Sequence, residues 1–269
     1  MQMTSSSISV VIPILEVDRQ SFLKCIENIQ SQSLKPDEVI FTTERNSTSA
    51  MIKSVLKNLS RSFPIEFKVV ENSGNLGIGQ ALNVGIRHAR GDIIVRHDVD
   101  DVMHSERIKK IERLFKSDNK IDVVHSNTFS KHRLMSDTRK LHRVSKLKHQ
   151  FILKNPIVHP TVAFRKSTVI RFGNYDPTLR YCEDLDLWLR WMKCGATFYY
   201  ITTALVLYNA PTGVRINQNW RTNLLVRIRN YKSPNVFYAA LGIICMAGFV
   251  LIPDSVRAFI YRKMKAQKS

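Results

Sequence analysis

Short apolar runs rich in β-branched residues alternate with amphipathic segments along the first part of the chain. The apolar runs are residues 9–15, 37–43, 66–70 and 91–96. Apolar residues recur at helical spacing in the segments 18–31, 51–59 and 80–89. A strand that is apolar on both faces is typical of a parallel sheet covered by helices on each side. We therefore predict an α/β fold, in which Pro13 ends the first strand and Asp18 caps the first helix.

The loops that follow these strands are the places to search for function, because ligands of such sheets bind beyond the carboxyl ends of the strands. The loops are residues 13–18, 43–49 and 97–105.

The second half of the chain is less regular. Segment 131–150 is rich in Lys and Arg and indicates a solvated or mobile connection at the surface. Beyond it we predict a strand over 160–164, a helix over 185–192 and one or two strands over 197–207.

The charge of the chain favours a polyanionic partner. Lys and Arg number 41 against 22 Asp and Glu, which gives a formal charge of +19 over 269 residues. Aromatic residues are not interleaved with the basic ones, and neither zinc-finger spacing nor an RNA-binding signature is present. We therefore expect an anionic membrane surface rather than nucleic acid.

The cysteines and the N-terminus both favour a location inside the cell. Cys25, Cys182, Cys194 and Cys245 show no paired or metal-binding spacing, which is typical of a reducing compartment. Residues 1–7 contain no basic residue, and the apolar run after them is short, which argues against a signal peptide.

An acidic cluster follows the fourth predicted strand directly. Asp98, Asp100 and Asp101 stand beside His97, and three crowded carboxylates repel one another unless a cation lies among them. Hard oxygen ligands suit Mg²⁺ or Mn²⁺ holding a diphosphate, with His97 supporting the ligands rather than binding the ion. The alternative is that Asp100 or Asp101 caps a helix that begins near Glu106.

A second acidic pair, Glu183 and Asp184, precedes the helix predicted over 185–192. Carboxylates at a helix N-terminus are stabilised by the helix dipole, so a purely structural capping role is one interpretation. The presence of the first cluster favours a functional one. Trp188 and Trp191 are at helical spacing, and we expect them in the core rather than stacked on a ligand.

Several motifs occur together in one order. They are Val11-Ile-Pro13, the run Glu38–Glu44, the segment 72–85 with Gly-Gln-Ala-Leu-Asn83, Arg96-His-Asp98-Val-Asp100-Asp101, Asn155-Pro-Ile-Val-His159 and Glu183-Asp-Leu-Asp-Leu-Trp188. Over roughly residues 7–208 this series resembles family 2 of the glycosyltransferases, above all the bacterial O-antigen and exopolysaccharide transferases. The resemblance implies the GT-A fold, a mixed and mostly parallel sheet flanked by helices.

The resemblance also implies a donor site for a nucleotide sugar. Asp100 would bind Mn²⁺ or Mg²⁺, and Asp98 would contact the ribose or a metal-bound water. Glu44 stands where the family usually has the Asp that reads uracil, while Thr43 and Arg45 depart from the family pattern. The implied donor-binding residues are Pro13, Glu16, Glu44, Asn75, Asn83, Asp98 and Asp100, and the implied metal ligands are Asp98 and Asp100.

On the acceptor side, Asp184 resembles the general base of an inverting transfer. One carboxylate must lie opposite the leaving diphosphate and take the proton of the acceptor hydroxyl. Glu183 and His159 would bind the acceptor, although His159 could equally be a structural residue.

The implied reaction moves a sugar, with inversion, from a UDP-sugar to an undecaprenyl-diphosphate-linked oligosaccharide, which forms a β-linkage in bacterial surface polysaccharide. Residues 1–110 would bind the nucleotide sugar, 111–210 the acceptor, and 211–269 would form a helical tail. The alternatives are a sugar-phosphate nucleotidyltransferase, a basic nucleic-acid-binding protein and a non-catalytic scaffold. The first is disfavoured because loop 13–18 contains no Gly.

The tail contains the charge-free run 236–252, at the lower limit of the ~17 to 25 residues that span a bilayer. Basic residues flank this run on both sides and give no clear orientation. We predict that a helical pair lies peripherally in the headgroup layer at the cytoplasmic face of the inner membrane. The alternative is an ordinary buried C-terminal helix.

Overall fold

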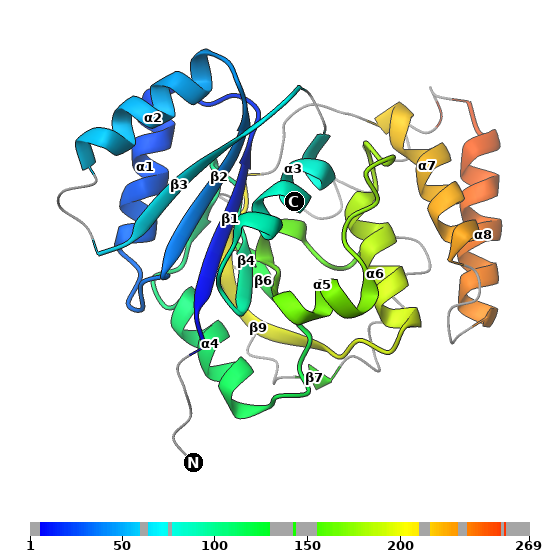
Figure 1. The fold of residues 1–269 in the computed structure, drawn as a ribbon. Coiled ribbons are helices and arrows are strands. Elements are labelled where there is room, and N and C mark those ends of the chain that lie inside the picture. The colour runs from blue at the N-terminus through cyan, green and yellow to red at the C-terminus, as the bar shows by residue number, and fades with distance from the viewer. Residues whose placement is uncertain are drawn as a thin grey trace.

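The computed structural model describes residues 6–59, 64–74, 77–129, 142–143, 155–209, 216–230, 236–253 and 256. Within them one mixed sheet is flanked by helices (Figure 1). The strands are β1 Ile8–Ile14, β2 Glu38–Glu44, β3 Glu66–Asn72, β4 Ile93–Arg96, β5 Val102–Met103, β6 Val123–Phe129, β7 His142–Arg143, β8 Ala163–Arg165 and β9 Phe198–Leu207. The helices are α1 Arg19–Gln30, α2 Ser47–Leu59, α3 Gly77–His88, α4 Arg107–Ser117, α5 Lys166–Phe172, α6 Glu183–Lys193, α7 Ile216–Arg229 and α8 Val236–Leu251.

The strands follow the order β3-β2-β1-β4-β8-β6-β9-β5, and β7 also pairs with β9. The first four strands of the chain are parallel to one another, as predicted. Strand β8 then joins β4 to β6 through two antiparallel pairings, and β9 runs parallel to β6. The carboxyl ends of β1, β2, β3 and β4 therefore lie at one edge of the sheet, where the predicted loops begin.

Strands β1, β2 and β4 are buried on both faces of the sheet, which explains their apolar sequences. Val10 and Ile12 point into a core with α1, α2 and α4. Val11, between them, points to the opposite side and packs with α3 and α6. Trp188 and Trp191 of α6 are fully buried there, which confirms their prediction as core residues.

Local structure confirms some predicted boundaries and corrects others. Asp18 caps α1 by accepting a hydrogen bond from Ser21 N. Strand β1 continues one residue beyond Pro13. The predicted strand 160–164 is wrong in its first part, because His159–Thr161 forms a 3₁₀ turn in which Val162 N bonds back to the carbonyl of His159. Only Ala163–Arg165 is extended.

Neither Asp100 nor Asp101 caps the helix that follows them, so that interpretation is wrong. Helix α4 begins at Arg107, and its N-cap is Glu106, which makes no side-chain capping bond. Asp101 instead accepts a hydrogen bond from the backbone N–H of Asn209, which follows β9.

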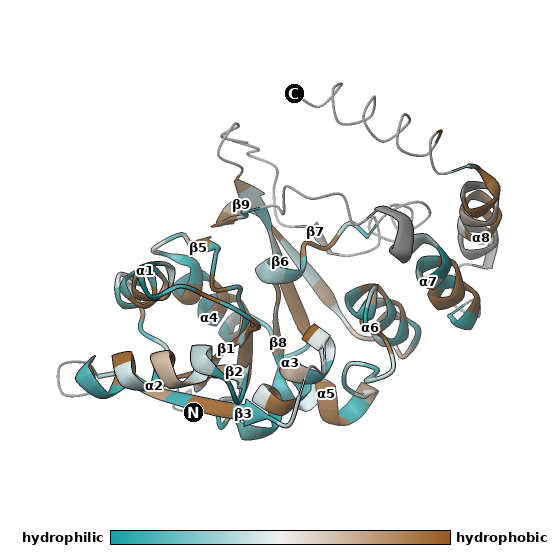
Figure 2. Ribbon diagram, turned by 90° about the horizontal axis from the view of Figure 1, so that it is seen from above, coloured by the Kyte–Doolittle hydropathy of each residue, from teal (hydrophilic) through white to brown (hydrophobic). Residues whose placement is uncertain are grey.

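The C-terminal helices lie at the end of the molecule remote from α1 and α2 (Figure 2). Val226 and Asn230, at the end of α7, are buried, and Val226 packs into the core beside α6. Large apolar side chains remain exposed on both helices, among them Leu225, Ile244 and Leu251. No helix in the described part of the chain has the length and apolar character that crossing a bilayer requires.

The basic segment 131–150 lies outside the described residues except for His142–Arg143. These two residues form β7 and pair antiparallel with β9, so at this point the chain is a strand.

Candidate active site

The first acidic cluster lies where β4 ends. Arg96, the last residue of the strand, is only 3% exposed, and its Nη1 donates to Asp98 Oδ2 at 2.6 Å. The side chain of Asp98 is 25% exposed and Asp100 is exposed, whereas Asp101 is buried. Oδ2 of Asp101 has no hydrogen-bond partner. The loop therefore exposes carboxylate oxygens to solvent, while its first residue is fixed inside the protein.

Crowding and burial make ionisation of the carboxyl groups in this loop unfavourable. Burial raises the pKa of Asp100, and the nearby charge of Asp98 adds to that effect. Burial likewise raises the pKa of Asp101 to about 7. A cation among these groups would stabilise their ionised forms.

The residues present fit a divalent ion that arrives with a substrate. In the described residues no group of three or more His, Cys, Asp or Glu side chains is assembled as a ready ligand set. Mg²⁺ and similar ions bind nucleotides through one or two carboxylates, with phosphate oxygens and water completing the shell. Asp98 and Asp100 supply that kind of incomplete, oxygen-only donor set.

A fully buried arginine fixes the base of the loop. Arg107 Nη2 donates to the carbonyls of Arg96 at 2.9 Å and Pro160 at 2.7 Å. Its Nη1 donates to Nδ1 of His97 at 3.1 Å. Burial and the charge of Arg107 hold the pKa of His97 well below its ordinary value, so the imidazole is neutral. Arg107 thus joins β4 to the turn that carries His159.

The second acidic pair begins α6. Cys182, just before it, has φ 59°, a left-handed conformation that is uncommon for a residue other than glycine. This turn directs Glu183 and Asp184 to the helix N-terminus. Asp184 Oδ1 accepts from Leu185 N at 2.7 Å, and Asp184 Oδ2 accepts from Asn155 Nδ2 at 2.6 Å.

Glu183 lies among buried groups on the same wall. Its Oε1 is 3.9 Å from Nδ1 of His159, and Nε2 of His159 is 2.8 Å from the hydroxyl of Tyr175. Gly79 of α3 packs against Glu183 and Tyr175 so closely that a Cβ on Gly79 would be 3.3 Å from the Cβ atom of each. Glycine at position 79 therefore lets α3 pack directly against Glu183 and Tyr175.

Asn83 occupies a supporting position. Its Nδ2 donates to Gln80 Oε1 and to the carbonyl of Tyr175, while its Oδ1 accepts from Tyr175 N. Both amide hydrogens are used inside the protein, so in this structure Asn83 holds Tyr175 in place.

The two acidic clusters are electrostatically connected through Arg96. Burial raises the pKa of Glu183, and the charge of Asp184 adds to this effect. Burial also raises the pKa of Asp184, while the guanidinium of Arg96 acts in the opposite direction on both carboxyls. The charge of Asp98 also raises the pKa of Glu183. Arg96 is thus the cation that both clusters share.

A pocket of about 440 Å³ opens at the carboxyl ends of β2 and β3. It is lined by Glu44, Arg45, Glu71, Asn72, Ser73 and Gly74. Oδ1 of Asn72 is buried and has no hydrogen-bond partner. Pro13 lies near the end of the neighbouring strand β1, and Glu16 follows that strand and is exposed. Asn75, also predicted to bind the donor, lies outside the described residues.

Four residues join the site for which the sequence had predicted no role: Arg96, Asn72, Asn155 and Tyr175. Arg96 and Asn72 end apolar strands, and Asn155 opens the Asn-Pro-x-x-His motif, so each carried a local signal. Tyr175 lies in an irregular loop and carried none.

The fold and the loops at the ends of β2 and β4 define a GT-A glycosyltransferase. Residues 9–173 match the sequence profile of glycosyl transferase family 2, and the chain belongs to that family.

Curated relatives are similar over nearly the whole chain. The amylovoran biosynthesis glycosyltransferase AmsE of Erwinia amylovora is 31% identical, over 95% of this chain and 98% of its own. The UDP-Gal:alpha-D-GlcNAc-diphosphoundecaprenol beta-1,3-galactosyltransferase of Escherichia coli is 28% identical, over 95% of each chain.

Solved structures share the fold. TarS residues 1–349 of S. aureus, in complex with UDP-GlcNAc, superposes with a TM-score of 0.68 at 14% identity, over 88% of this chain and 70% of that one. The mannosyltransferase PcManGT of Pyrobaculum calidifontis, with GDP-Man and Mn²⁺, gives 0.67 at 14% identity, over 98% and 81%.

Proposed function

We propose that the chain transfers a sugar, with inversion, from a UDP-sugar to a lipid-diphosphate-linked oligosaccharide in bacterial surface polysaccharide synthesis. The observation that carries the proposal is a pair of acidic clusters that the charge of Arg96 influences together. One cluster has exposed carboxylates suited to a metal-bound diphosphate, and the other has an oriented carboxylate suited to proton transfer.

The donor would extend from the pocket at β2 and β3 to the loop after β4. The Glu44 carboxylate would accept the imide N–H of uracil, with Pro13 and Glu16 along the same edge. Asp98 and Asp100 would hold Mn²⁺ or Mg²⁺, which when bound neutralises charge on the diphosphate leaving group. The UDP-GlcNAc in TarS and the Mn²⁺ in PcManGT support this choice of ligands.

Asp184 would act as the general base. Its carboxylate takes the proton of the acceptor hydroxyl while the hydroxyl oxygen bonds to the anomeric carbon and the bond to the diphosphate breaks. Attack from the side opposite the leaving group inverts the anomeric centre, so an α-linked donor gives a β-linked product. Glu183 would hold the acceptor sugar within reach of the base, and His159 would act on the acceptor through Glu183.

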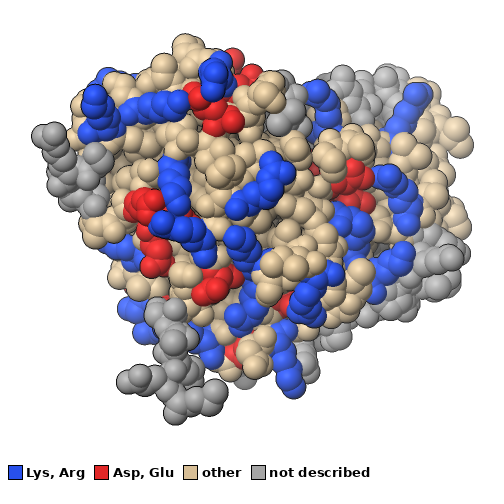
Figure 3. Space-filling model, viewed as in Figure 1, with Lys and Arg blue, Asp and Glu red and all other residues tan. Residues whose placement is uncertain are grey.

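The acceptor and the membrane belong to one part of this proposal. The name of the galactosyltransferase relative specifies a diphosphoundecaprenol-linked sugar as its acceptor. We propose an acceptor of that undecaprenyl class here. Charged side chains of both signs are spread over the face in Figure 3, without a single basic stripe. We assign contact with anionic lipid to α7, α8 and the basic sequence beyond them, at the cytoplasmic face of the inner membrane, because large apolar side chains are exposed on both helices.

A donor screen tests the reaction. UDP release would be measured with Mn²⁺ over a panel of UDP- and GDP-sugars, with lipid-diphospho-sugar acceptors. We expect acceptor-dependent release of UDP from one or a few UDP-sugars, lost in both Asp100→Ala and Asp184→Asn. Turnover of GDP-sugars alone, or near-normal turnover by Asp184→Asn, would contradict the assignment.

A truncation tests the membrane contact. A chain that ends at Asn230 keeps α7 and lacks α8 and the basic residues after it. We expect it to lose sedimentation with anionic vesicles, whereas the full chain stays bound at low salt. If the truncated chain remains fully bound in both low and high salt, the assignment of the tail is wrong.

A further inference from the structure

One short segment, residues 155–159, contacts both members of the acidic pair. Asn155 Nδ2 donates to Asp184 Oδ2 at 2.6 Å. Four residues later, Nδ1 of His159 faces Oε1 of Glu183 at 3.9 Å. The two carboxylates are adjacent in sequence but face different partners, one an amide and the other an imidazole.

The partners of Asp184 fix its orientation and favour its ionised form. Leu185 N donates to one carboxylate oxygen and Asn155 Nδ2 to the other. Hydrogen bonds donated to a carboxylate stabilise its charge. Each oxygen can accept more than one hydrogen bond, so Asp184 keeps capacity for a proton from the acceptor.

The partners of Glu183 are arranged differently. Burial holds the pKa of His159 well below its ordinary value and raises that of Tyr175, so both rings are neutral. If the Tyr175 hydroxyl donates to Nε2 of His159, the imidazole proton is on Nδ1 and faces Glu183. The opposite tautomer would turn a lone pair toward the carboxylate. Asn83 fixes this arrangement, because it bonds both backbone polar groups of Tyr175.

We propose that Asn155 and His159 are positioning residues that give the two carboxylates different tasks. Asn155 orients Asp184 to accept the proton, while Tyr175 sets the His159 tautomer that holds Glu183 toward the acceptor. The inference rests on the proposed function, since it assumes that Asp184 is the base.

Other ionisable groups also influence the pKa values of Glu183 and Asp184, so these groups must stay unchanged in the test. Arg96 and Asp98 interact with the pair from the end of β4, Tyr175 from the loop before α6, and Cys182 from the turn itself. None of these groups is changed in the Asn155 variants, so a shift in the pH profile of those variants reports on the bond to Asp184.

The first experiment follows kcat against pH in Asn155→Ala and Asn155→Asp. Loss of the amide donor, or its replacement by a carboxylate, should move the acid limb of the profile to higher pH by about one unit. At pH 7 kcat should fall about 10-fold to 100-fold, with KM for the donor nearly unchanged. Asn127→Ala is the matched control, because the Asn127 carboxamide bonds to Thr128 N on β6.

The second experiment observes the histidine ring directly. In ¹⁵N–¹H spectra of the wild type, the signal that disappears in His159→Gln should have the shifts of the Nδ1–H tautomer. In Tyr175→Phe that signal should change toward the Nε2–H tautomer, and kcat/KM for the acceptor should fall about 10-fold. An Nε2–H tautomer in the wild type would overturn the His159 part of the proposal.

The two levels of inference fail separately. If Asp184→Asn is inactive but the acid limbs of both Asn155 variants match the wild type, the positioning role is wrong and the base assignment stands. If Asp184→Asn retains turnover, the proposed function itself is wrong.

Discussion

The two acidic clusters contain the same chemical group in different surroundings. After β4, Asp98 and Asp100 are accessible to solvent, and the partner of Asp98 is the charged guanidinium of Arg96. At the start of α6, Glu183 is buried, and Asp184 is bonded by two neutral N–H donors. The first arrangement leaves carboxylate oxygens open for a cation. The second leaves Asp184, the proposed proton acceptor, only partly exposed beside a buried neighbour.

The difference shows how environment assigns function to carboxylates. Attraction for a dication persists in partly exposed groups, and substrate phosphates can complete the coordination. Proton transfer needs a carboxylate whose proton affinity lies nearer to neutral pH, which burial provides. The elevated pKa of Asp184 agrees in direction with that requirement.

Asp184→Asn is expected to have the largest effect. The amide keeps the size of the side chain but cannot accept the proton, so kcat should fall about 10⁴-fold. Affinity for UDP with Mn²⁺ should be unchanged, because the proposed donor site is in the other cluster. Calorimetric titration of UDP, beside initial rates, checks both statements. Loss of UDP binding in this variant would show that the two clusters do not divide the work as described.

Asp100→Ala should have the complementary effect. Removal of this proposed metal ligand should lower kcat/KM about 10³-fold and weaken Mn²⁺-dependent UDP binding by a factor of about 10². Mn²⁺ titration followed by water proton relaxation measures the loss of the ion directly. Unchanged Mn²⁺ affinity would remove the metal assignment without affecting that of the base.

Arg96→Met tests whether one cation serves both clusters. Arg96 lowers the pKa of Glu183 and of Asp184, so its removal should raise both and shift the acid limb of the rate profile upward. We expect kcat/KM to fall about 10²-fold at pH 7, with partial recovery at higher pH. Arg96→Lys, which keeps the charge, is the control. An equal and pH-independent loss in both variants would indicate a purely structural role.

Much of the fold could be predicted from sequence because its determinants are local. The β-branched runs predicted β1 to β4, and the Asp18 cap was identified correctly. The turn at His159–Thr161 was missed because the apolar run 160–164 suits either conformation. The bond from Arg107 to the carbonyl of Pro160 links segments far apart in the chain. No periodicity encodes that contact.

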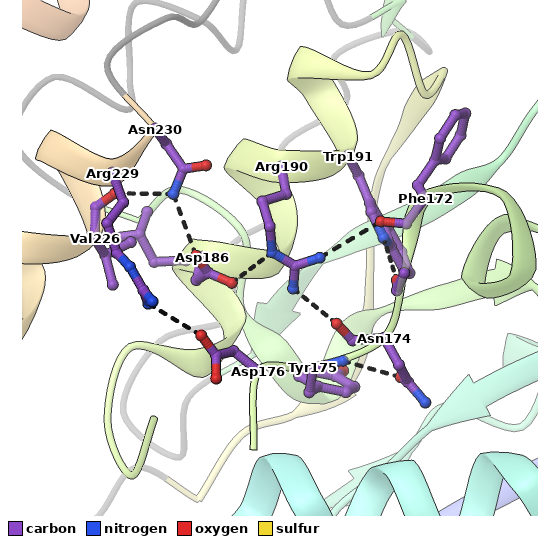
Figure 4. A network of polar contacts seen from close by, with 12 residues as sticks. Phe172, Asn174, Tyr175, Asp176, Asp186, Arg190, Trp191, Val226, Arg229 and Asn230 are labelled. Carbon is purple, nitrogen blue, oxygen red and sulfur yellow. Dashed lines mark hydrogen bonds and ion pairs between the residues drawn. The ribbon is translucent and has the colours of Figure 1, made fainter. Parts of the chain in front are cut away.

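The candidate site likewise combines features that are local in the sequence with contacts between distant segments. The acidic residues could be identified because they follow strands or begin a helix, where ligand sites concentrate. Their partners could not be identified, since Tyr175 meets His159 only after the loop before α6 folds against the turn. Figure 4 shows how that loop is held: Asp186 bonds Arg190 of α6 and Asn230 at the end of α7, while Arg190 bonds the carbonyl of Asn174.

A third carboxylate, remote from the site, sharpens the contrast with a smaller effect. Glu38 is buried, yet its pKa is lowered to about 2, because bonds from Lys68, Ser9 and the backbone of Arg90 outweigh the cost of burial. Burial alone therefore does not raise the pKa of a carboxyl when charged and neutral donors surround it. Glu38→Gln should lower the free energy of unfolding by about 2 kcal/mol at pH 7. Urea denaturation measures this loss.

The pH dependence of that loss follows from the direction of the shift. A folded-state pKa below the unfolded value gives stability that is fully present above pH 4.5 and is lost as the pH falls toward about 2. The difference between wild type and Glu38→Gln should therefore shrink over that interval. Glu66→Gln is the matched control, because Glu66 pairs with the same Lys68 and Arg90 but is 45% exposed. It should change stability by no more than about 0.5 kcal/mol. A difference for Glu38→Gln that stays constant down to pH 2 would mean that packing, rather than charge, accounts for its contribution.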